Sequence, residues 1–196
     1  MTAGTNPGPD TAHRARIITA AARLTAESGW SAVTMGRLAA EVGVSRQTVY
    51  NDVGGKDALA EAMILTELQR FLDVVDRAFE SQPTDLVAAI RAASYGVLDL
   101  ASGNPLLHAV VSATHGASTE LLPLLTTHSE PLLAAAKRAI TGHLAAYDTA
   151  LDADRADALV DLVVRTVLSH VMQPSASPAR TADDLAWLAE RVLRPH

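Results

Sequence analysis

The sequence predicts an all-α protein of about nine helices. Apolar residues recur at helical spacing through most of the chain, and clusters of Gly, Pro, Ser and Asn divide it into helix-sized segments. No segment has a convincing strand pattern. We expect a disordered arm at residues 1–10, a three-helix domain that contains a helix-turn-helix at residues 11–55, and a larger helical domain at residues 56–196.

The composition excludes several classes of protein. The 196 residues are 48% hydrophobic, which suits one large or two small domains, and the absence of Cys rules out disulfides, thiolate metal sites and a cysteine nucleophile. No apolar run approaches the roughly 18 residues of a membrane span. Residues 1–10 lack the basic start and apolar stretch of a signal peptide. We therefore expect a cytoplasmic protein that does not contact a membrane.

Charge is unevenly distributed along the chain, whose net charge is −6. Residues 1–60 carry six basic and five acidic groups, whereas the rest carries ten and seventeen. This balance argues against a general nucleic-acid binder, so any contact with DNA must use a few basic residues gathered on one face. The candidates are Arg14, Arg16, Arg37, Arg46 and Lys56. For Arg14 and Arg16, scattered solubilising charge is an equally good interpretation.

The first predicted helix supports the N-terminal domain. Asp10 or Thr11 can cap it, and it ends at Ser28-Gly29. Trp30 and Val33 follow and can close the base of the domain. The apolar stripe of this helix comprises Ile17, Ile18, Ala21, Leu24 and Thr25.

Two short helices follow in the stretch from Thr34 to Leu59. Thr34 can cap the first helix and Gly43 can end it. Ser45 is a second capping residue for a helix from Arg46 to Asp52, which Gly54-Gly55 ends. The pattern of helix, tight glycine turn and helix predicts a helix-turn-helix.

In a helix-turn-helix, the first residues of the second helix meet base edges in the major groove of DNA. Arg46 can bond guanine and Gln47 can bond adenine in a bidentate way, so these two are the predicted base readers. Hydroxyl groups and Lys56, which stands at the start of the next helix, can bind phosphates. The predicted DNA-binding set is Thr34, Arg37, Ser45, Arg46, Gln47, Thr48, Tyr50, Asn51 and Lys56.

Two other interpretations of this stretch are weaker. The two helices could be ordinary core helices with a solvated polar face. Gly54-Gly55-Lys56 could suggest a phosphate-binding loop, but no strand precedes it and no Ser or Thr follows Lys56.

Residues 12–60 resemble the DNA-binding domain of the TetR family of bacterial repressors. The family typically has a helix that starts with Thr, a Gly-Val-Ser turn and a Tyr-x-x-Phe-x-x-Lys segment. This chain has Thr34, Gly43-Val44-Ser45 and the segment from Tyr50 to Lys56. It departs from the pattern at Val53, where Phe is usual, and at Asn51, where His is common. The resemblance implies a palindromic operator and a four-helix dimer interface.

Further helices are predicted in the larger domain. They run from Lys56 to about Ser81, from near Pro83 to Ala101, from Pro105 to about Thr114, and from about Glu130 onward, after a region interrupted by Pro123 and Pro131. Asp152 can cap the next helix, in which Asp157, Asp161 and Arg165 form a solvated stripe with one favourable pair. Thr181 and Asp184 resemble a capping box for the last helix.

The last two predicted helices have more apolar surface than one chain's core requires. They could simply complete that core, but we favour a homodimer interface, because a helix-turn-helix dimer must hold two recognition helices about 34–36 Å apart. The predicted interface residues are Val160, Val163, Val164, Val167, Leu168, Val171, Leu185, Leu188 and Val192.

A ligand pocket is expected in the larger domain, although each candidate residue is more often plain core than pocket. The candidates are Leu68, Phe71, Tyr95, Leu98, Val111, Leu125 and Leu144. No cofactor or metal is expected, because His108, His115, His128 and His143 show no tight ligand spacing. Residues 104–133 also resemble, more narrowly, actinobacterial TetR-like regulators of alkane or fatty-acid metabolism, which implies a long apolar inducer such as a fatty acid.

Together these features predict a ligand-responsive transcriptional regulator. We expect a repressor that binds a palindromic double-stranded operator as a homodimer and is released by a small apolar effector. An architectural DNA binder without an effector should have a smaller, more basic body. An enzyme is disfavoured, because neither a Gly-rich nucleotide loop nor a Gly-x-Ser-x-Gly or His-Glu-x-x-His motif occurs.

Overall fold

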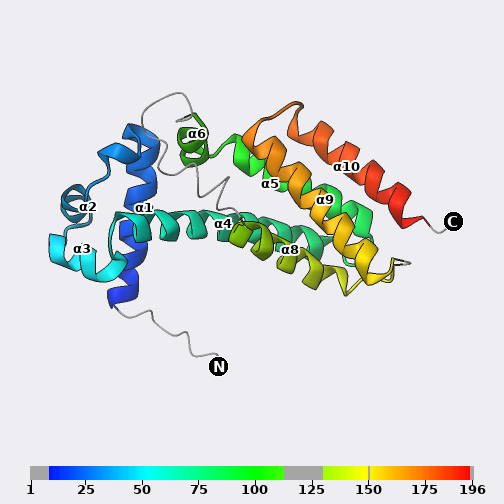
Figure 1. Ribbon diagram of the computed structural model, residues 1–196, viewed down its shortest axis with the longest axis horizontal. Coiled ribbons are helices and arrows are strands. Elements are labelled where there is room, and N and C mark those ends of the chain that lie inside the picture. Colours follow the sequence, from blue (N-terminus) through cyan, green and yellow to red (C-terminus); the bar gives the residue numbers. More distant parts are fainter. Residues whose placement is uncertain (1–8, 113–129, 150, 195–196) are drawn as a thin grey trace. The chain divides into compact units, whose positions relative to one another are not determined.

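The computed structural model describes residues 9–112, 130–149 and 151–194. Within these ranges every regular element is helical, so the expected all-α fold is confirmed (Figure 1). The predicted arm, apart from its last two residues, and Leu125 lie outside the described residues. The elements are α1 (Pro9–Ser28), the short 3-10 helix η1 (Trp30–Ala32), α2 (Met35–Val42), α3 (Arg46–Val53), α4 (Lys56–Ser81), α5 (Leu86–Ser102), α6 (Pro105–Ser112), α8 (Glu130–Leu144), α9 (Ala153–Met172) and α10 (Pro178–Leu193).

The chain divides into two compact units. The first comprises Met1–Glu67 with Pro105–Thr127, and the second comprises Leu68–Asn104 with His128–His196. Helix α4 therefore contributes its first part to one unit and its second part to the other. The functional boundary at residue 55 stays a prediction.

The core of the first unit is built from α1, η1, α2, α3, the start of α4 and α6. Ile17, Leu38, Val49 and Leu59 are completely buried in it. Trp30 and Val33 are also buried, as predicted for residues that close the base of the domain. Helix α6 packs against α1 through Leu106 and Val110, so this segment of the chain returns to the first unit.

The second unit is organised around α5, which lies along α10 and also packs against α9 (Figure 1). Val160 and Ala189 are buried in the shared core. Helix α5 approaches α4 closely at Gly96, where an added Cβ atom would lie only 2.6 Å from Cγ1 of Val74. Because real Cβ contacts are essentially never that short, glycine lets the two helices meet here.

Most predicted helix starts are confirmed, and two are wrong. Asp10 or Thr11 was expected to cap the first helix, but α1 begins at Pro9, so both residues lie inside it. Helix α4 begins at Lys56, α6 begins at Pro105 and Asp152 caps α9 by accepting the N–H of Arg155. Helix α10, in contrast, does not begin at the predicted Thr181, which is 4% exposed inside the helix. It begins at Pro178 with Ser177 as its cap. Proline at the first helical position has no N–H that needs a partner, so the Ser-Pro pair is the stronger start signal.

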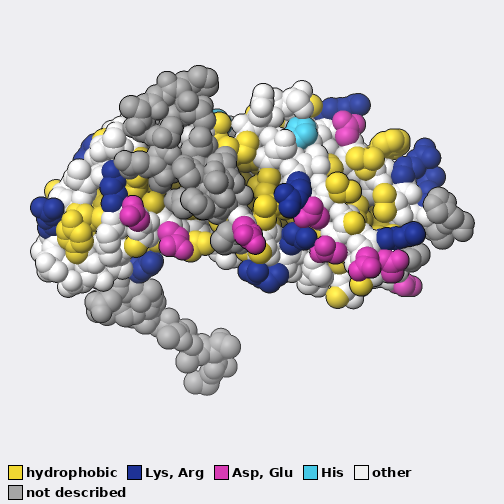
Figure 2. Space-filling view, viewed as in Figure 1, with side chains coloured by type: hydrophobic (Ala, Val, Ile, Leu, Met, Phe, Trp, Pro, Cys, Tyr) yellow, Lys and Arg dark blue, Asp and Glu magenta, His cyan; other side chains and the backbone are white. Residues whose placement is uncertain are grey.

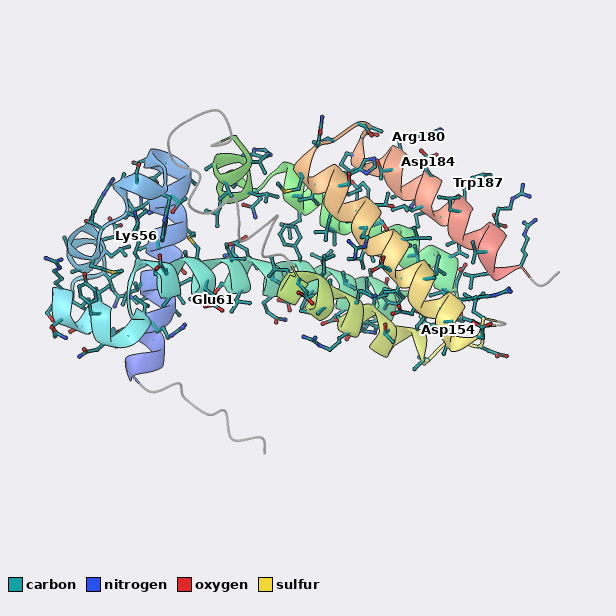
Figure 3. All side chains as sticks on the ribbon, viewed as in Figure 1. Lys56, Glu61, Asp154, Arg180, Asp184 and Trp187 are labelled. Carbon is teal, nitrogen blue, oxygen red and sulfur yellow. The ribbon has the colours of Figure 1, made fainter. Side chains whose placement is uncertain are left out.

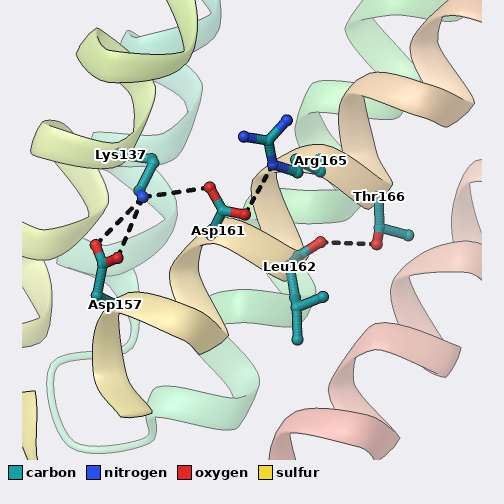
Figure 4. Close-up of polar contacts among 6 residues, drawn as sticks. All are labelled: Lys137, Asp157, Asp161, Leu162, Arg165 and Thr166. Atoms are coloured by element: carbon teal, nitrogen blue, oxygen red, sulfur yellow. Dashed lines mark hydrogen bonds and ion pairs between the residues drawn. The ribbon is translucent and has the colours of Figure 1, made fainter. Parts of the chain in front are cut away.

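An ion-pair network connects α8 with α9 in the second unit. Lys137 Nζ lies 3.3 Å from Asp157 and 3.2 Å from Asp161, and Arg165 Nε donates to Asp161 at 2.7 Å (Figure 4). The predicted pair of Asp161 and Arg165 is therefore present. Hydrogen bonds from Arg165 and then from Lys137 hold the pKa of Asp161 below its ordinary value. The sequence did not indicate that Lys137 would join the stripe.

The other edge of α8 contacts α4. His143 Nε2 lies 2.7 Å from Oδ1 of Asp76, and its ring stacks on Phe79 with centroids 4.8 Å apart. Just after α8, the Tyr147 hydroxyl donates to the carbonyl of Gln82 at 2.7 Å. Burial, and then the charge of Asp85, raise the pKa of Tyr147. Polar contacts thus join α8 to its neighbours along both edges.

Candidate DNA-binding surface and effector cavity

The geometry of α2 and its turn follows from Thr34 and Gly43. The Thr34 hydroxyl accepts the N–H of Arg37 at 3.1 Å, so Thr34 is the cap that the sequence predicted. Gly43 ends α2 with φ 77°, and its N–H donates to the carbonyl of Ala39. Residues other than glycine rarely adopt this left-handed backbone conformation. The residue therefore fixes the tight turn into α3.

Helix α3 presents one face to the core and the other to solvent. Ser45 caps it by accepting the N–H of Thr48 at 3.0 Å, as predicted. Val49 and Val53 are buried, so the valine at the usual family phenylalanine position still fills the core. The opposite face exposes the predicted residues Arg46, Gln47, Tyr50 and Asn51.

The exposed side chains of α3 hold one another in place. Gln47 Nε2 donates to Oδ1 of Asn51 at 2.9 Å, and the guanidinium carbon of Arg46 lies 5.7 Å from the centroid of the Tyr50 ring. Both pairs are one helical turn apart, the spacing at which side chains meet on a helix face. The amide of Gln47 and the guanidinium of Arg46 thus each have a partner on the same exposed face of α3.

Lys56 is the first residue of α4, at the helix end where phosphates bind most readily (Figure 3). Its ammonium lies 5.0 Å from the centroid of the Trp30 ring, within the range of a cation–π contact. Trp30 itself is buried, so the ammonium group of Lys56 packs against a side chain of the protein core. The sequence reasoning did not foresee the pair.

Two arginines of α1 support the helix-turn-helix rather than lie free on the surface. Arg16 Nη2 donates to the carbonyl of Val42 at 2.7 Å, where α2 ends. Arg23 bonds both Glu27 on its own helix and Glu41 on α2. The carbonyls at the end of a helix need partners from outside the helix, and Arg16 supplies one. The sequence suggested either DNA contact or solubilising charge for Arg16. The structure shows a further role, in which Arg16 binds a carbonyl at the end of α2.

The second unit contains an apolar cavity with a volume of about 130 Å³. The described residues of its wall come from α4, α5, α8 and α9, and Ser94 of α5 is the one polar residue among them. Among the predicted pocket residues, Leu68 and Phe71 line it. Ile140, on α8, is a lining residue that the sequence reasoning missed. The apolar pattern around Ile140 is the same as that of a helix face packed in the core.

The remaining predicted pocket residues lie elsewhere. Leu98 and Leu144 are buried in the core of the second unit, and Tyr95 is 42% exposed. Val111 belongs to α6 in the first unit. The cavity is also lined by Val163, Val164, Val167, Leu168 and Val171, which the sequence reasoning assigned to the dimer interface.

The predicted interface residues differ in exposure. Val160, Val164, Val167 and Leu185 are buried within their own chain, Val163 and Val171 are half-buried, and Leu168, Leu188 and Val192 are exposed. Leu162 and Trp187, outside the predicted set, are 65% and 55% exposed. We call Leu162, Leu168, Trp187, Leu188 and Val192 the α9/α10 surface. Figure 2 shows apolar side chains exposed over these two helices, and Figure 3 labels Trp187 on α10.

The described residues hold no group of three or more His, Cys, Asp or Glu side chains placed to bind a metal ion, and His115 and His128 lie outside them. No single described helix is long and apolar enough to cross a membrane. One bent pair, Leu86–Ser102 with Pro105–Val111, has the length and composition of a broken span.

Two family models match the chain. The model described as "Bacterial regulatory proteins, tetR family" matches residues 17–63, which contain the helix-turn-helix. The model described as "Bacterial Tetracyclin repressor, C-terminal domain" matches residues 85–191, more than half of the chain.

Individual relatives agree with the family models. The HTH-type transcriptional regulator AlkX of Mycobacterium tuberculosis (strain ATCC 25618 / H37Rv) is 28% identical over 167 residues, which cover 85% of this chain and 78% of that protein. The crystal structure of the TetR family repressor AlkX from Dietzia sp. strain DQ12-45-1b, implicated in biodegradation of n-alkanes, has a TM-score of 0.73 and 28% identity, covering 97% of both chains. The fatty acid degradation regulator FadR from Bacillus halodurans, at 18% identity and a TM-score of 0.58 with 98% and 100% of the two chains covered, shares the fold.

Proposed function

This chain belongs to the TetR family of bacterial regulatory proteins and is a DNA-binding transcriptional regulator; on that premise we propose that it is a cytoplasmic repressor released by a small apolar effector. It binds a palindromic operator as a homodimer, with α3 in the major groove. The observation that carries the proposal is the combination of ordered, exposed polar side chains on α3 with an apolar cavity in the second unit.

Recognition of the DNA sequence depends on α3. Arg46 and Gln47 occupy its first two positions, where a recognition helix meets base edges. Their side chains match the bidentate patterns of guanine and adenine, and each good pair contributes roughly 1–3 kcal/mol of discrimination. Ser45, Thr48 and Lys56 bind the phosphate backbone and so fix the register of the protein on DNA.

The α9/α10 surface is the proposed homodimer interface. Trp187 and Leu162 are large apolar side chains that are more than half exposed in a single chain. A two-fold axis through this surface would match it with an identical copy of itself, which is how most homodimers form. The two recognition helices could then reach successive major grooves, about 34–36 Å apart.

The cavity is the proposed effector site. A ligand releases DNA only if it binds the DNA-incompetent state more tightly, and the shift is limited by that difference in affinity. The apolar wall fits a hydrocarbon-like molecule, and the link of the Dietzia AlkX repressor to n-alkane biodegradation supports the same chemistry. A long-chain fatty acid, which the sequence resemblance implied, is one ligand to test.

The proposal is tested by fluorescence-anisotropy binding to duplexes tiled across the DNA that flanks the protein's own gene, at two salt concentrations. We expect one palindromic tile to bind far more tightly than the others. An n-alkane or a fatty acid should then weaken that binding. Selective binding that no apolar ligand changes would point to an architectural DNA binder without an effector.

A further inference from the structure

The cavity is small, and its wall has a single polar position among the residues that the structure describes. Its volume of about 130 Å³ is close to that of an engineered cavity of about 150 Å³ that accepts benzene. As it stands, it therefore holds a molecule of roughly six to eight non-hydrogen atoms. Among its described lining residues, Leu168 alone is exposed, and it belongs to the α9/α10 surface.

The Ser94 hydroxyl lacks the hydrogen bond that several other hydroxyl residues of the described helices make, as does the hydroxyl of buried Thr181. The hydroxyls of Thr25, Thr66 and Thr166 each donate to the carbonyl one turn earlier, at 2.7–2.8 Å. Ser94 is only 4% exposed, yet its hydroxyl takes part in none of the hydrogen bonds among the described residues. A hydroxyl offers one donor and two acceptor positions, and leaving it unpaired in an apolar environment is unfavourable.

None of the described lining residues is a Lys, Arg or His that could neutralise an anion. Three basic residues that each directly follow a lining residue are engaged by carboxylates outside the cavity: Arg91 bonds Asp183, and Lys137 and Arg165 both bond Asp161. Burying a carboxylate without a partner is strongly unfavourable, so this cavity disfavours an ionised fatty acid at the position of Ser94.

We propose that Ser94 is the specificity-determining residue of the cavity, and that the ligand is a short apolar molecule with one neutral hydroxyl or carbonyl group bonded to Ser94. This inference rests on the proposed function, because it takes the cavity as the effector site. It selects an oxygenated molecule over both a pure alkane and a carboxylate.

The test compares 1-hexanol with n-heptane, which have the same number of non-hydrogen atoms. The full-length protein is labelled at the δ1 methyl groups of its five isoleucines and titrated by NMR. Ile90 and Ile140 line the cavity, whereas Ile17, Ile18 and Ile64 do not. Binding in the cavity should shift the signals of Ile90 and Ile140 and leave the other three in place.

The decisive variant is Ser94→Ala, which removes the hydroxyl and little volume. We expect the ratio of hexanol affinity to heptane affinity to fall by roughly 2- to 10-fold, the value of one net hydrogen bond, while heptane affinity stays the same. Hexanoate at neutral pH should bind the unmodified protein on the order of tenfold more weakly than hexanol, or not at all. The control is Ser102→Ala on the same helix, whose hydroxyl bonds the carbonyl of Asp99 outside the cavity.

The outcomes separate the inference from the proposed function. An unchanged affinity ratio in Ser94→Ala would show that Ser94 is only a small residue required for packing. Hexanoate binding as tight as hexanol binding would overturn the preference for a neutral group. If neither heptane nor hexanol shifts the signals of Ile90 and Ile140, the cavity is not the effector site and the effector part of the proposed function fails.

Discussion

The guanidinium of Arg16 donates a 2.7 Å hydrogen bond to the carbonyl of Val42, and so ties α1 to the last residue of α2, directly before the Gly43 turn. This turn sets the direction of α3. We expect Arg16→Ala to reduce the free energy of unfolding by about 1 kcal/mol, because the bond is lost and the carbonyl of Val42 loses its partner. Urea unfolding measures the loss, and anisotropy should show weaker operator binding.

The control for this prediction is Arg14→Ala, which removes the same charge from the same helix. Arg14 is exposed. If both variants lose stability and operator affinity equally, Arg16 contributes only its charge, and its role in holding the turn is wrong.

Gln47 and Lys56 should affect DNA binding in different ways. Gln47→Ala should relax base choice at one operator position, with a cost of about 1–3 kcal/mol at that position. Lys56→Ala should weaken binding to all duplexes alike and reduce the salt slope by about one. Anisotropy with single-base operator variants at several salt concentrations separates the two effects. Equal changes in specificity would contradict the assignment.

The close contact between Gly96 and Val74 predicts a stability change that a second substitution should reverse. Gly96→Ala places a methyl group 2.6 Å from Cγ1 of Val74, and overpacking of this kind typically costs about 1–3 kcal/mol. In the double variant Gly96→Ala with Val74→Ala, most of the loss should be recovered because the clashing methyl groups are gone. Thermal unfolding measures both. A Gly96→Ala protein as stable as the parent would show that the helices separate at no cost.

Dimerisation should depend on the α9/α10 surface. Trp187→Glu should shift the protein from dimer to monomer in analytical ultracentrifugation and weaken operator binding. The helix should still form, because the side chain is 55% exposed in one chain. Leu65→Glu is the matched control, since Leu65 is similarly exposed on α4 but lies outside this surface. A dimer that survives Trp187→Glu unchanged would place the interface elsewhere.

The α8–α9 network predicts an acid-dependent loss of stability. Hydrogen bonds from Arg165 and Lys137 lower the pKa of Asp161, so the native state favours the charged carboxylate. Its contribution is therefore fully present above the ordinary pKa of 3.8 and is lost as the pH falls through the lowered native value. In urea unfolding, Asp161→Asn should be less stable than the parent at neutral pH, and the difference should shrink in strong acid. A constant difference across the acid range would contradict this account.

The local features of the first unit were predictable from sequence. The caps at Thr34 and Ser45 and the turn at Gly43 depend on neighbours within a few residues, and the structure confirms all three. The start of α10 was missed for a local reason too, since Ser177-Pro178 is the stronger signal. The contact of Lys56 with Trp30 was not predictable, because it joins residues far apart in the chain.

The cavity and the α9/α10 surface were harder to predict. An apolar helix face has the same sequence pattern whether it packs in the core, lines a cavity or is exposed to solvent. Val164 and Leu188 were both assigned to the interface, yet Val164 is buried and Leu188 is half exposed. Which side of a wide apolar helix remains uncovered depends on where α5 packs. The place of Ser94 in the cavity wall was not predictable either, because it is a property of the packed unit.

The central claim is that a ligand in the cavity releases the operator. The most direct measurement is the anisotropy of the palindromic operator complex during titration with 1-hexanol, for the parent protein and for Ala136→Phe, which should fill the cavity. The account predicts that the ligand weakens operator binding by the parent several-fold, a coupling of about 1–3 kcal/mol, and has no effect on the filled variant. Equal loss of operator binding by the parent and by Ala136→Phe would contradict this claim. So would unchanged operator binding by the parent when hexanol shifts the signals of Ile90 and Ile140.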